Sequence, residues 1–288
     1  MPRLVVSVPC HNEAPYIEEC LKSIAENDLS DVQVFITDNS TDGSTGIIRS
    51  FLARLPENIK KHFKLFTWGS PTNMPENWKK AFDETDSEYF MWVGGHDAVT
   101  DNFFKSCLEV FDKEPQASIV SGKPLALNKD STKITELKTF YDFSSPDPLT
   151  RYLKATEELG DCTVLHSIFK KTALREFEFP YLGAADHILI SNILWHGTLV
   201  YCDGAGYVRR FFDSENRKAK ADQGYYLNDQ NKLLWYQEYM KNFIKCSDGQ
   251  YPAEIYPHIK TLFFNTLCKR FGLPNTLSTS KNPLLEVA

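Results

Sequence analysis

YFMWVGGHDAVTDNFF, residues 89–104, is the stretch that constrains the fold most strongly. Its large apolar residues predict a buried strand over residues 89–93, and a Gly-Gly pair ends that strand abruptly. His96 and Asp97 follow at the carboxyl end, and a helix is expected to begin near Asp101. In an open α/β sheet ligands bind at the carboxyl ends of strands, where glycines let a ligand approach the backbone. The stretch therefore predicts a binding site, with a polar turn that caps the next helix as the alternative.

The same two polar residues offer two ligands to a divalent metal ion. A carboxylate oxygen such as that of Asp97 suits Mg²⁺ or Mn²⁺, and the imidazole of His96 is tolerated by Mn²⁺. A single carboxylate holds such an ion weakly, because these ions use substrate phosphate oxygens to complete their coordination. We therefore expect the ion to bind together with a phosphate-bearing substrate.

The composition narrows the class of protein. The chain has 288 residues, of which 42% are hydrophobic and 24% charged, as is ordinary for a soluble globular protein. A formal net charge of −6 argues against a nucleic-acid-binding protein. Seven cysteines without a CxxC pair favour free thiols in a reducing compartment over disulfides or a zinc site. With neither a signal peptide nor an apolar membrane span, a cytoplasmic protein is expected.

Strand and helix patterns alternate over the first 100 residues. Apolar, β-branched runs predict strands at residues 4–8, 32–37, 63–67 and 89–93. Strands that alternate with helices predict an α/β fold with a mostly parallel sheet flanked by helices. Polar clusters follow the first, second and fourth strands, namely His11 with Glu13, Asp38 with Asn39, and His96 with Asp97. Because the carboxyl ends of parallel strands share one edge, these clusters should converge.

Beyond residue 104 the pattern is looser. Further elements are expected at residues 117–121 (strand), 181–195 (helix), 198–202 (strand), and 227–245 and 253–271 (helices). Residues 207–212, with Arg209 and Arg210, extend the region that follows the strand at 198–202. The polar, basic residues 213–224 predict a mobile loop. The last two helices carry aromatic residues interleaved with lysines. We expect these helices to pack on the rest of the chain, with contact to the inner membrane face or to a second copy as the alternative.

Four segments together resemble the inverting family 2 glycosyltransferases, which have the GT-A fold. In chain order they are SVPCHNEAPYIEECLKSI, FITDNSTDGS, the strand that ends in GGHD, and LGAADHILISNILWHGTLVYCDGAGYVRR. They are similar to the family's first strand and turn, its Asp-rich turn, its acidic metal-binding pair, and its helix with the following strand and arginine. No segment is decisive alone, but the set in this order is specific.

The resemblance implies a GT-A nucleotide-diphospho-sugar transferase domain over residues 1–215. Its nucleotide-binding half would cover about residues 1–100 and its acceptor half about residues 101–215. Residues 216–288 would hold the mobile loop, a helical appendage and the tail. The implied activity, typical of polysaccharide biosynthesis, transfers a sugar from a nucleoside-diphosphate donor, with a UDP-sugar expected first. The acceptor would be a glycan, a lipid-linked or a protein hydroxyl, and the anomeric carbon would be inverted.

The resemblance also assigns donor-binding residues. Asp38 would accept from the imide N–H of uracil, although an Asx-turn residue fits the same position. Glu13 would line the base and ribose, although a carboxylate there also suits the first turn of a helix. The other implied nucleotide-sugar contacts are Pro9, His11, Asn73, Asn77, His96 and Arg210.

Two departures from the family concern the metal and the base. Family members carry an acidic residue where this chain has Gly94, so Asp97, with His96, would hold the Mn²⁺ or Mg²⁺ ion. That ion would stabilise the leaving diphosphate, assisted by Arg209, Arg210 and the basic residues 217–220, unless those are a solvated loop. Asp186 resembles the general base, although Ala185 stands where the family often has Glu, and His187 is the less favoured candidate. The alternative for Asp186 is a helix N-terminal carboxylate held by the helix dipole.

Two other functions fit parts of the pattern. A nucleotidyltransferase shares the broad fold, but it usually opens with a glycine-rich basic phosphate loop where this chain has PCHNE. A catalytically degenerate GT-A domain, kept as a nucleotide-sugar-binding or assembly module, would explain the glycine at position 94. Transfer or hydrolysis of a donor in the presence of Mn²⁺ or Mg²⁺ separates these readings.

Overall fold

The computed structural model describes residues 1–69, 74–128, 133–160, 162–174, 184–211 and 232–271. The chain forms two compact units. Unit 1 comprises Met1–Phe140, Thr163–Arg175 and Leu199–Asp213, and unit 2 comprises Tyr141–Cys162, Glu176–Thr198 and Ser214–Ala288. The predicted domain boundary near residue 215 stays a prediction. Asn73, the predicted loop 213–224 and the tail lie outside the described residues.

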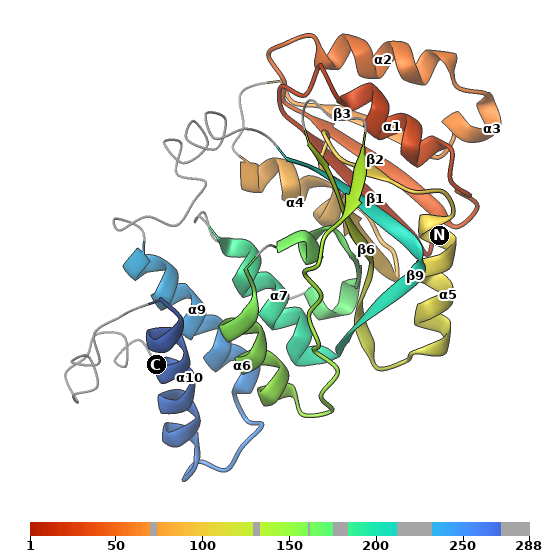
Figure 1. The fold of residues 1–288 in the computed structure, drawn as a ribbon. Helices are drawn as coiled ribbons and strands as arrows, with labels where there is room; N and C mark the ends of the chain where they lie inside the picture. The colour runs from red at the N-terminus through yellow and green to blue at the C-terminus, as the bar shows by residue number, and fades with distance from the viewer. Residues whose placement is uncertain (70–73, 129–132, 161, 175–183, 212–231, 272–288) are drawn as a thin grey trace. The chain divides into compact units, whose positions relative to one another are not determined.

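One sheet of nine strands runs through the described part of the chain, in the order β3-β2-β1-β4-β8-β6-β9-β5, with β7 beside β6 (Figure 1). The strands are β1 (Leu4–Cys10), β2 (Val32–Asp38), β3 (Phe63–Thr67), β4 (Tyr89–Trp92), β5 (Ala98–Val99), β6 (Ala117–Asn128), β7 (Ile134–Glu136), β8 (Ile168–Lys170) and β9 (Thr198–Phe211). The predicted parallel part is β3-β2-β1-β4. Beyond it, β8 pairs antiparallel with both β4 and β6, and β5 pairs antiparallel with β9. The predicted α/β fold with a partly parallel sheet flanked by helices is confirmed.

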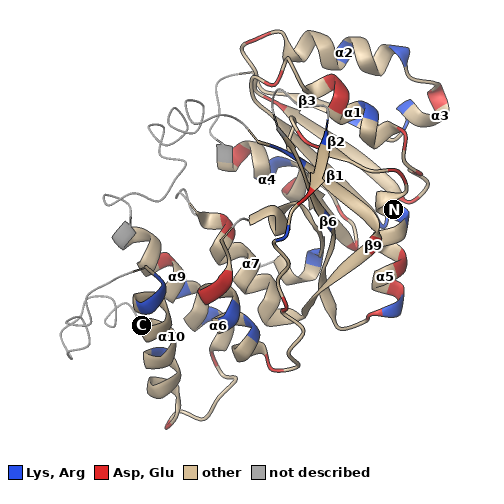
Figure 2. Cartoon of the chain, in the orientation of Figure 1, with Lys and Arg blue, Asp and Glu red and all other residues tan. Residues whose placement is uncertain are grey.

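The helices of unit 1 follow from the apolar spacing of the sequence. They are α1 (Ile17–Ala25), α2 (Ser44–Arg54), α3 (Glu57–Lys60), α4 (Met74–Glu84) and α5 (Phe103–Lys113). Ile17, Leu21 and Ile24 recur at helical spacing and are all buried, so α1 buries one face. β1 is buried along its whole length, as expected for a central parallel strand. Figure 2 shows both acidic and basic residues on α1, α3 and α5.

The strand expected at residues 198–202 is longer than predicted, because β9 is continuous from Thr198 to Phe211. A Cβ atom on Gly206 would lie 2.6 Å from Leu125 Cδ1 and 3.0 Å from Thr100 Cγ2. A larger residue at this position of the strand would therefore have to displace one of these side chains.

Unit 2 is a helical unit with an aromatic core. Its helices are α6 (Pro148–Glu158), α7 (Ala185–His196), α9 (Lys232–Ser247) and α10 (Tyr256–Phe271). Tyr152 contacts the rings of Tyr239, Phe243 and Phe263, and Phe243 stacks on Phe263 with the ring centroids 4.2 Å apart. The aromatic residues of α9 and α10 therefore form the interior of this unit.

Two further observations concern the whole described chain. None of its helices combines the length and the apolar character that crossing a bilayer requires. All seven cysteines lie in this part of the chain, and none of them forms a disulfide.

Candidate functional site

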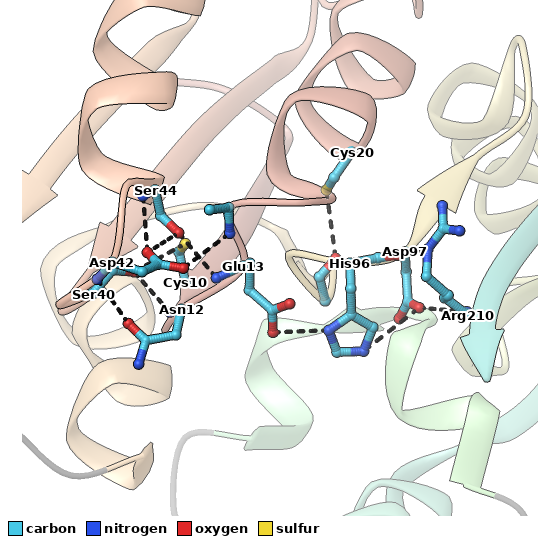
Figure 3. A network of polar contacts seen from close by, with 12 residues as sticks. Cys10, Asn12, Glu13, Cys20, Ser40, Asp42, Ser44, His96, Asp97 and Arg210 are labelled. Atoms are coloured by element: carbon cyan, nitrogen blue, oxygen red, sulfur yellow. Dashed lines mark hydrogen bonds and ion pairs between the residues drawn. The ribbon is translucent and has the colours of Figure 1, made fainter. Parts of the chain in front are cut away.

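The turns that follow β1 and β2 are joined by hydrogen bonds (Figure 3). Asn12 has a left-handed backbone, φ 58°, which asparagine tolerates better than most residues. Its side-chain oxygen accepts from the amides of Thr41 at 2.8 Å and Asp42 at 3.2 Å. Its own amide donates to Ser40 Oγ at 2.9 Å. The two turns therefore form one rigid edge at the carboxyl ends of both strands.

Asp38, the predicted base-recognition residue, lies at the end of β2 and is buried. One carboxylate oxygen accepts from the Ser40 amide at 3.0 Å, and the other accepts from Thr45 Oγ1 at 2.5 Å. The bond to Ser40 is the Asx-turn that the sequence left open as an alternative. It does not exclude a ligand, since each carboxylate oxygen carries a second lone pair.

Beside this edge lie three more of the predicted donor-binding residues. His11 is exposed, and its Nδ1 is 3.1 Å from Asn39 Oδ1. Pro9 is buried within β1. Asn77 is buried, and its side chain donates to Cys10 O at 3.3 Å and accepts from Trp68 Nε1 at 2.8 Å.

Trp68 was not singled out from the sequence, although it directly follows a predicted strand. It is half-exposed, and its amide donates to Asp38 O at 3.0 Å. A partly exposed indole beside Asp38, the predicted base-recognition residue, is a candidate stacking surface for a nucleobase.

The turns after β1 and β4 meet at His96. Figure 3 shows this imidazole between two carboxylates, with Nδ1 2.9 Å from Glu13 Oε1 and Nε2 3.7 Å from Asp97 Oδ1. With the contact of His11 to Asn39, all three predicted polar clusters are thereby brought to one edge of unit 1.

The two glycines before His96 lie against side chains of the chain itself, a role that the sequence did not indicate. A Cβ atom on Gly94 would lie 2.7 Å from Asp97 Oδ2, and one on Gly95 would lie 3.1 Å from Glu13 Cγ. The approach of a ligand to these glycines stays a prediction. With Asp97 in this position, a side chain at residue 94 would collide with the Asp97 carboxylate.

Asp97 is buried and anchored on both oxygens. Oδ2 accepts from Tyr207 Oη at 2.6 Å, and Oδ1 accepts from the Arg210 amide at 2.8 Å. Burial, reinforced by the negative charge of Asp97, raises the pKa of Tyr207 well above its usual value, so the phenol remains a donor. The Arg210 guanidinium donates to His96 O at 3.0 Å and to Glu19 Oε2 at 2.7 Å. Arg210 therefore braces the turn that carries His96 and Asp97.

His166 is a further polar group here that the sequence did not indicate. Its ring stacks on Tyr207 with centroids 4.8 Å apart, and its Nε2 is 4.0 Å from Asp97 Oδ2. Burial lowers the pKa of His166 to about 4, so the imidazole is neutral near pH 7. The residues around His166 in the sequence give no sign of a functional role, because His166 and Asp97 are far apart in the chain and meet only in the folded structure.

The donor chemistry beside Asp97 fits a hard divalent ion that takes most of its ligands from a substrate. His96 Nε2 and Asp97 Oδ1 are 3.7 Å apart, and these two side chains would hold the ion. Within the described residues, no third His, Cys, Asp or Glu ligand atom completes a group here. A phosphate-bearing ligand would have to supply the remaining oxygens.

The predicted base lies in unit 2. Asp186 is the second residue of α7 and is half-buried. The helix is entered through Ala184 in a left-handed conformation, φ 60°, and Trp235 Nε1 donates to Ala184 O at 2.9 Å. His187 follows, and burial lowers its pKa. Ligand atoms of Cys162, Asp186 and His187 lie within 4.8 Å of one another, a grouping that the spacing in the sequence does not suggest.

Comparisons with known proteins agree with this architecture. The family model described as glycosyl transferase family 2 matches residues 5–177, more than half of the chain. The structure is similar to S. aureus TarS 1-349 in complex with UDP-GlcNAc, with a TM-score of 0.68 and 16% identity over 99% of this chain and 78% of that one. It is also similar to the mannosyltransferase PcManGT from Pyrobaculum calidifontis in complex with GDP-Man and Mn²⁺, with a TM-score of 0.55 and 17% identity over 99% and 78% of the two chains. No curated protein sequence matches the chain.

Proposed function

The chain belongs to glycosyl transferase family 2, and from this premise we propose that it transfers a sugar from a nucleoside-diphosphate donor to an acceptor hydroxyl with inversion. The observation that carries the proposal is the meeting of the turns after β1, β2 and β4 at one edge of unit 1. The acceptor class is a glycan, a lipid-linked or a protein hydroxyl. We expect a cytoplasmic protein, with peripheral contact to the inner membrane face as the alternative.

Donor recognition is assigned to the joined turns. Asp38, with Pro9, His11, Glu13 and Asn77, would hold the base and ribose, and Trp68 would stack on the base. A uridine donor is the first choice, in keeping with a pyrimidine imide facing a carboxylate. The similar structures carry UDP-GlcNAc and GDP-Man, so both bases belong in the test.

The diphosphate is assigned to the turn that ends β4. Asp97 and His96 would hold Mn²⁺ or Mg²⁺, which supplies positive charge that stabilises the leaving diphosphate. Arg210 would support this turn through His96, and its side chain would remain near the donor. The hydrogen bonds from Tyr207 and the Arg210 amide fix Asp97 in advance, which reduces the reorganisation needed on binding.

Proton transfer is assigned to Asp186. Inversion needs one base to take the proton from the acceptor hydroxyl as that oxygen attacks the anomeric carbon. A half-buried carboxylate at a helix entry is suited to this, and the assignment rests on the sequence motif. The donor diphosphate leaves as an anion, so no second protein acid is required.

A catalytically degenerate nucleotide-sugar-binding module is the second candidate. It is favoured by the buried Asp97, whose oxygens are already hydrogen-bonded, and by the lack of space for an acidic side chain at Gly94. Such a module would bind a donor without breaking it.

A thermal-shift screen of UDP- and GDP-sugars, with Mn²⁺, with Mg²⁺ and with chelator, tests the proposal. A ligand of the native state raises the apparent melting temperature. We expect a shift with a nucleotide sugar that grows with metal, and slow donor hydrolysis by the same mixture. A shift without hydrolysis or transfer to any acceptor would favour the binding module, and the absence of any shift would contradict donor binding altogether.

A further inference from the structure

We propose that Cys162, Asp186 and His187 of unit 2 form a second metal site, selective for a borderline-soft transition-metal ion such as Zn²⁺. We further propose that an ion bound there blocks Asp186. This site is separate from the Mn²⁺ or Mg²⁺ assigned to Asp97 and His96, and no part of it belongs to the donor-binding edge.

The geometry of the three side chains suits one ion. A thiol sulfur, a carboxylate oxygen and an imidazole nitrogen lie within 4.8 Å of one another. Around one zinc ion, with ligand distances of about 2.0–2.3 Å, such atoms lie roughly 3–4 Å apart. Small side-chain rotations therefore close the site.

The donor chemistry decides which ion binds. Thiolate ligands select Zn²⁺ and related soft or borderline ions, whereas Mg²⁺ and Mn²⁺ prefer oxygen. Cys162 supplies sulfur here, while the pair at Asp97 and His96 has none. The site at Cys162, Asp186 and His187 therefore favours Zn²⁺, whereas the pair Asp97 and His96 favours Mn²⁺ or Mg²⁺.

The charges balance as well. Cys162 is buried, and as a thiolate it would bring one negative charge beside that of Asp186, so the pair matches a divalent cation. Asp186 and His187 lie in the first turn of α7, where the helix dipole places about half a positive charge. That partial charge opposes a cation but is smaller than the two negative charges.

The helix entry that carries two of the ligands is held in place from α9. Trp235 donates to Ala184 O at 2.9 Å, and its ring meets that of His187 edge-on with centroids 6.4 Å apart. Tyr239 Oη donates to His187 O at 3.5 Å. Three protein ligands leave a fourth tetrahedral position open, which is typical of sites whose ion exchanges or meets a small ligand.

Occupation of this site would stop proton transfer. A carboxylate that coordinates Zn²⁺ cannot also accept the proton of an acceptor hydroxyl, so the ion would act as an inhibitor. This consequence rests on the proposed role of Asp186 as the base, whereas the binding of the ion does not.

Metal binding is tested on the full chain after removal of metal with a chelator. Co²⁺ is titrated as a spectroscopic probe for Zn²⁺, and thiolate coordination gives a charge-transfer band in the near ultraviolet. We expect a single equivalent to bind with this band, and Zn²⁺ to displace it. Cys162→Ser should abolish the band, and His187→Gln should weaken binding roughly 10-fold or more. Cys246→Ser, on α9, is the matched cysteine control and should keep the band.

A wild type without the band, or a band that survives Cys162→Ser, would overturn the site. Circular dichroism of each variant checks that it is folded, and His187→Gln gives an independent reading if Cys162→Ser does not fold. A chain that shows the band but no transferase activity would refute the proposed function and leave the site standing.

Inhibition is measured separately, as the Zn²⁺ dependence of transfer in excess Mn²⁺, with each protein compared with its own zinc-free rate. We expect Zn²⁺ to inhibit the wild type and Cys246→Ser, and Cys162→Ser to resist. Equal inhibition of all three would show that Zn²⁺ acts elsewhere and would overturn the inhibitory role.

Discussion

The carboxylates of the two units are held in opposite ways. In unit 1, Asp38 and Asp97 are buried, and both oxygens of each accept hydrogen bonds from fixed donors. In unit 2, Asp186 is half-buried and accepts from the amide of His187, and the side chains grouped with it are a thiol and an imidazole. A carboxylate tied on both oxygens is suited to hold a ligand in one orientation. A carboxylate beside a thiol and an imidazole, which can both gain or lose a proton or bind a metal ion, is suited to proton transfer.

This difference between the two units predicts that nucleotide binding depends on unit 1 and that the rate of transfer depends on Asp186 in unit 2. Changes at the edge of unit 1 should alter nucleotide affinity and stability together, because the same hydrogen bonds serve both. Changes at the start of α7 should alter the rate with little effect on nucleotide affinity. The following predictions test that separation, from the largest expected effect to the smallest.

Asp186→Asn should lower the transfer rate by about 10²- to 10⁴-fold, because an amide cannot take a proton from the acceptor. UDP affinity, measured by calorimetry, should stay at the wild-type value. Asp248→Asn, an exposed substitution also in unit 2, is the matched control and should leave both quantities unchanged. A wild-type rate in Asp186→Asn would move the base to another residue, with His187 tested first.

Asp38→Ala should weaken UDP binding by about 1–3 kcal/mol and lower the free energy of unfolding by a similar amount, because Ser40 and Thr45 lose their acceptor. Calorimetry with UDP and urea denaturation measure the two effects. Asp38→Asn keeps the shape and one acceptor, and it should be less destabilised. If stability falls while UDP affinity stays unchanged, Asp38 is an Asx-turn residue alone.

Asn12→Ala should lower the free energy of unfolding by about 1–3 kcal/mol, since two backbone amides lose their acceptor and alanine is strained at φ 58°. Asn12→Asp keeps the acceptor and tolerates this conformation, so it should retain most of the stability. The midpoints of urea denaturation compare them. An alanine variant as stable as the wild type would show that the joined turns do not depend on this side chain.

Ala184→Gly should raise the free energy of unfolding by up to about 1 kcal/mol, because glycine relieves the left-handed strain at φ 60°. Ala185→Gly, one residue further and inside α7, should instead lower it by about 0.5–1 kcal/mol. Urea denaturation of the pair gives the answer. Destabilisation by both substitutions would mean that the helix entry is not strained.

Much of unit 1 could be predicted because its signals are local. The run LVVSV and the turn DNSTDGS each fix their own structure, and parallel pairing then brings the three polar clusters to one edge. His166 and Tyr207 escaped prediction because their contacts with Asp97 depend on β8 and β9, whose positions the local pattern does not reveal. The close contact between Gly94 and the Asp97 side chain escaped prediction for the same reason. The sequence shows that residue 94 is a glycine, but it does not show whether a ligand or a neighbouring side chain lies beside that glycine.

In unit 2 the sequence indicated the helices but not the grouping of side chains. Asp186 and His187 are adjacent in the chain, whereas Cys162 lies before α7 in a separate turn, η1 (Cys162–His166). No short spacing joins these three residues, so a search for metal-ligand motifs passes over them. Their proximity depends on how Cys162 and the entry to α7 are placed within unit 2.

The most direct test of the account is UDP binding to the wild type, measured by calorimetry once in chelator and once in Mn²⁺. We predict that Mn²⁺ tightens binding at least about tenfold, equivalent to about 1.4 kcal/mol, because Asp97 and His96 would hold the ion and its positive charge would attract the diphosphate. In Asp97→Asn this gain should disappear while the metal-independent affinity remains. Equal UDP affinity in chelator and in Mn²⁺ for the wild type would contradict the account.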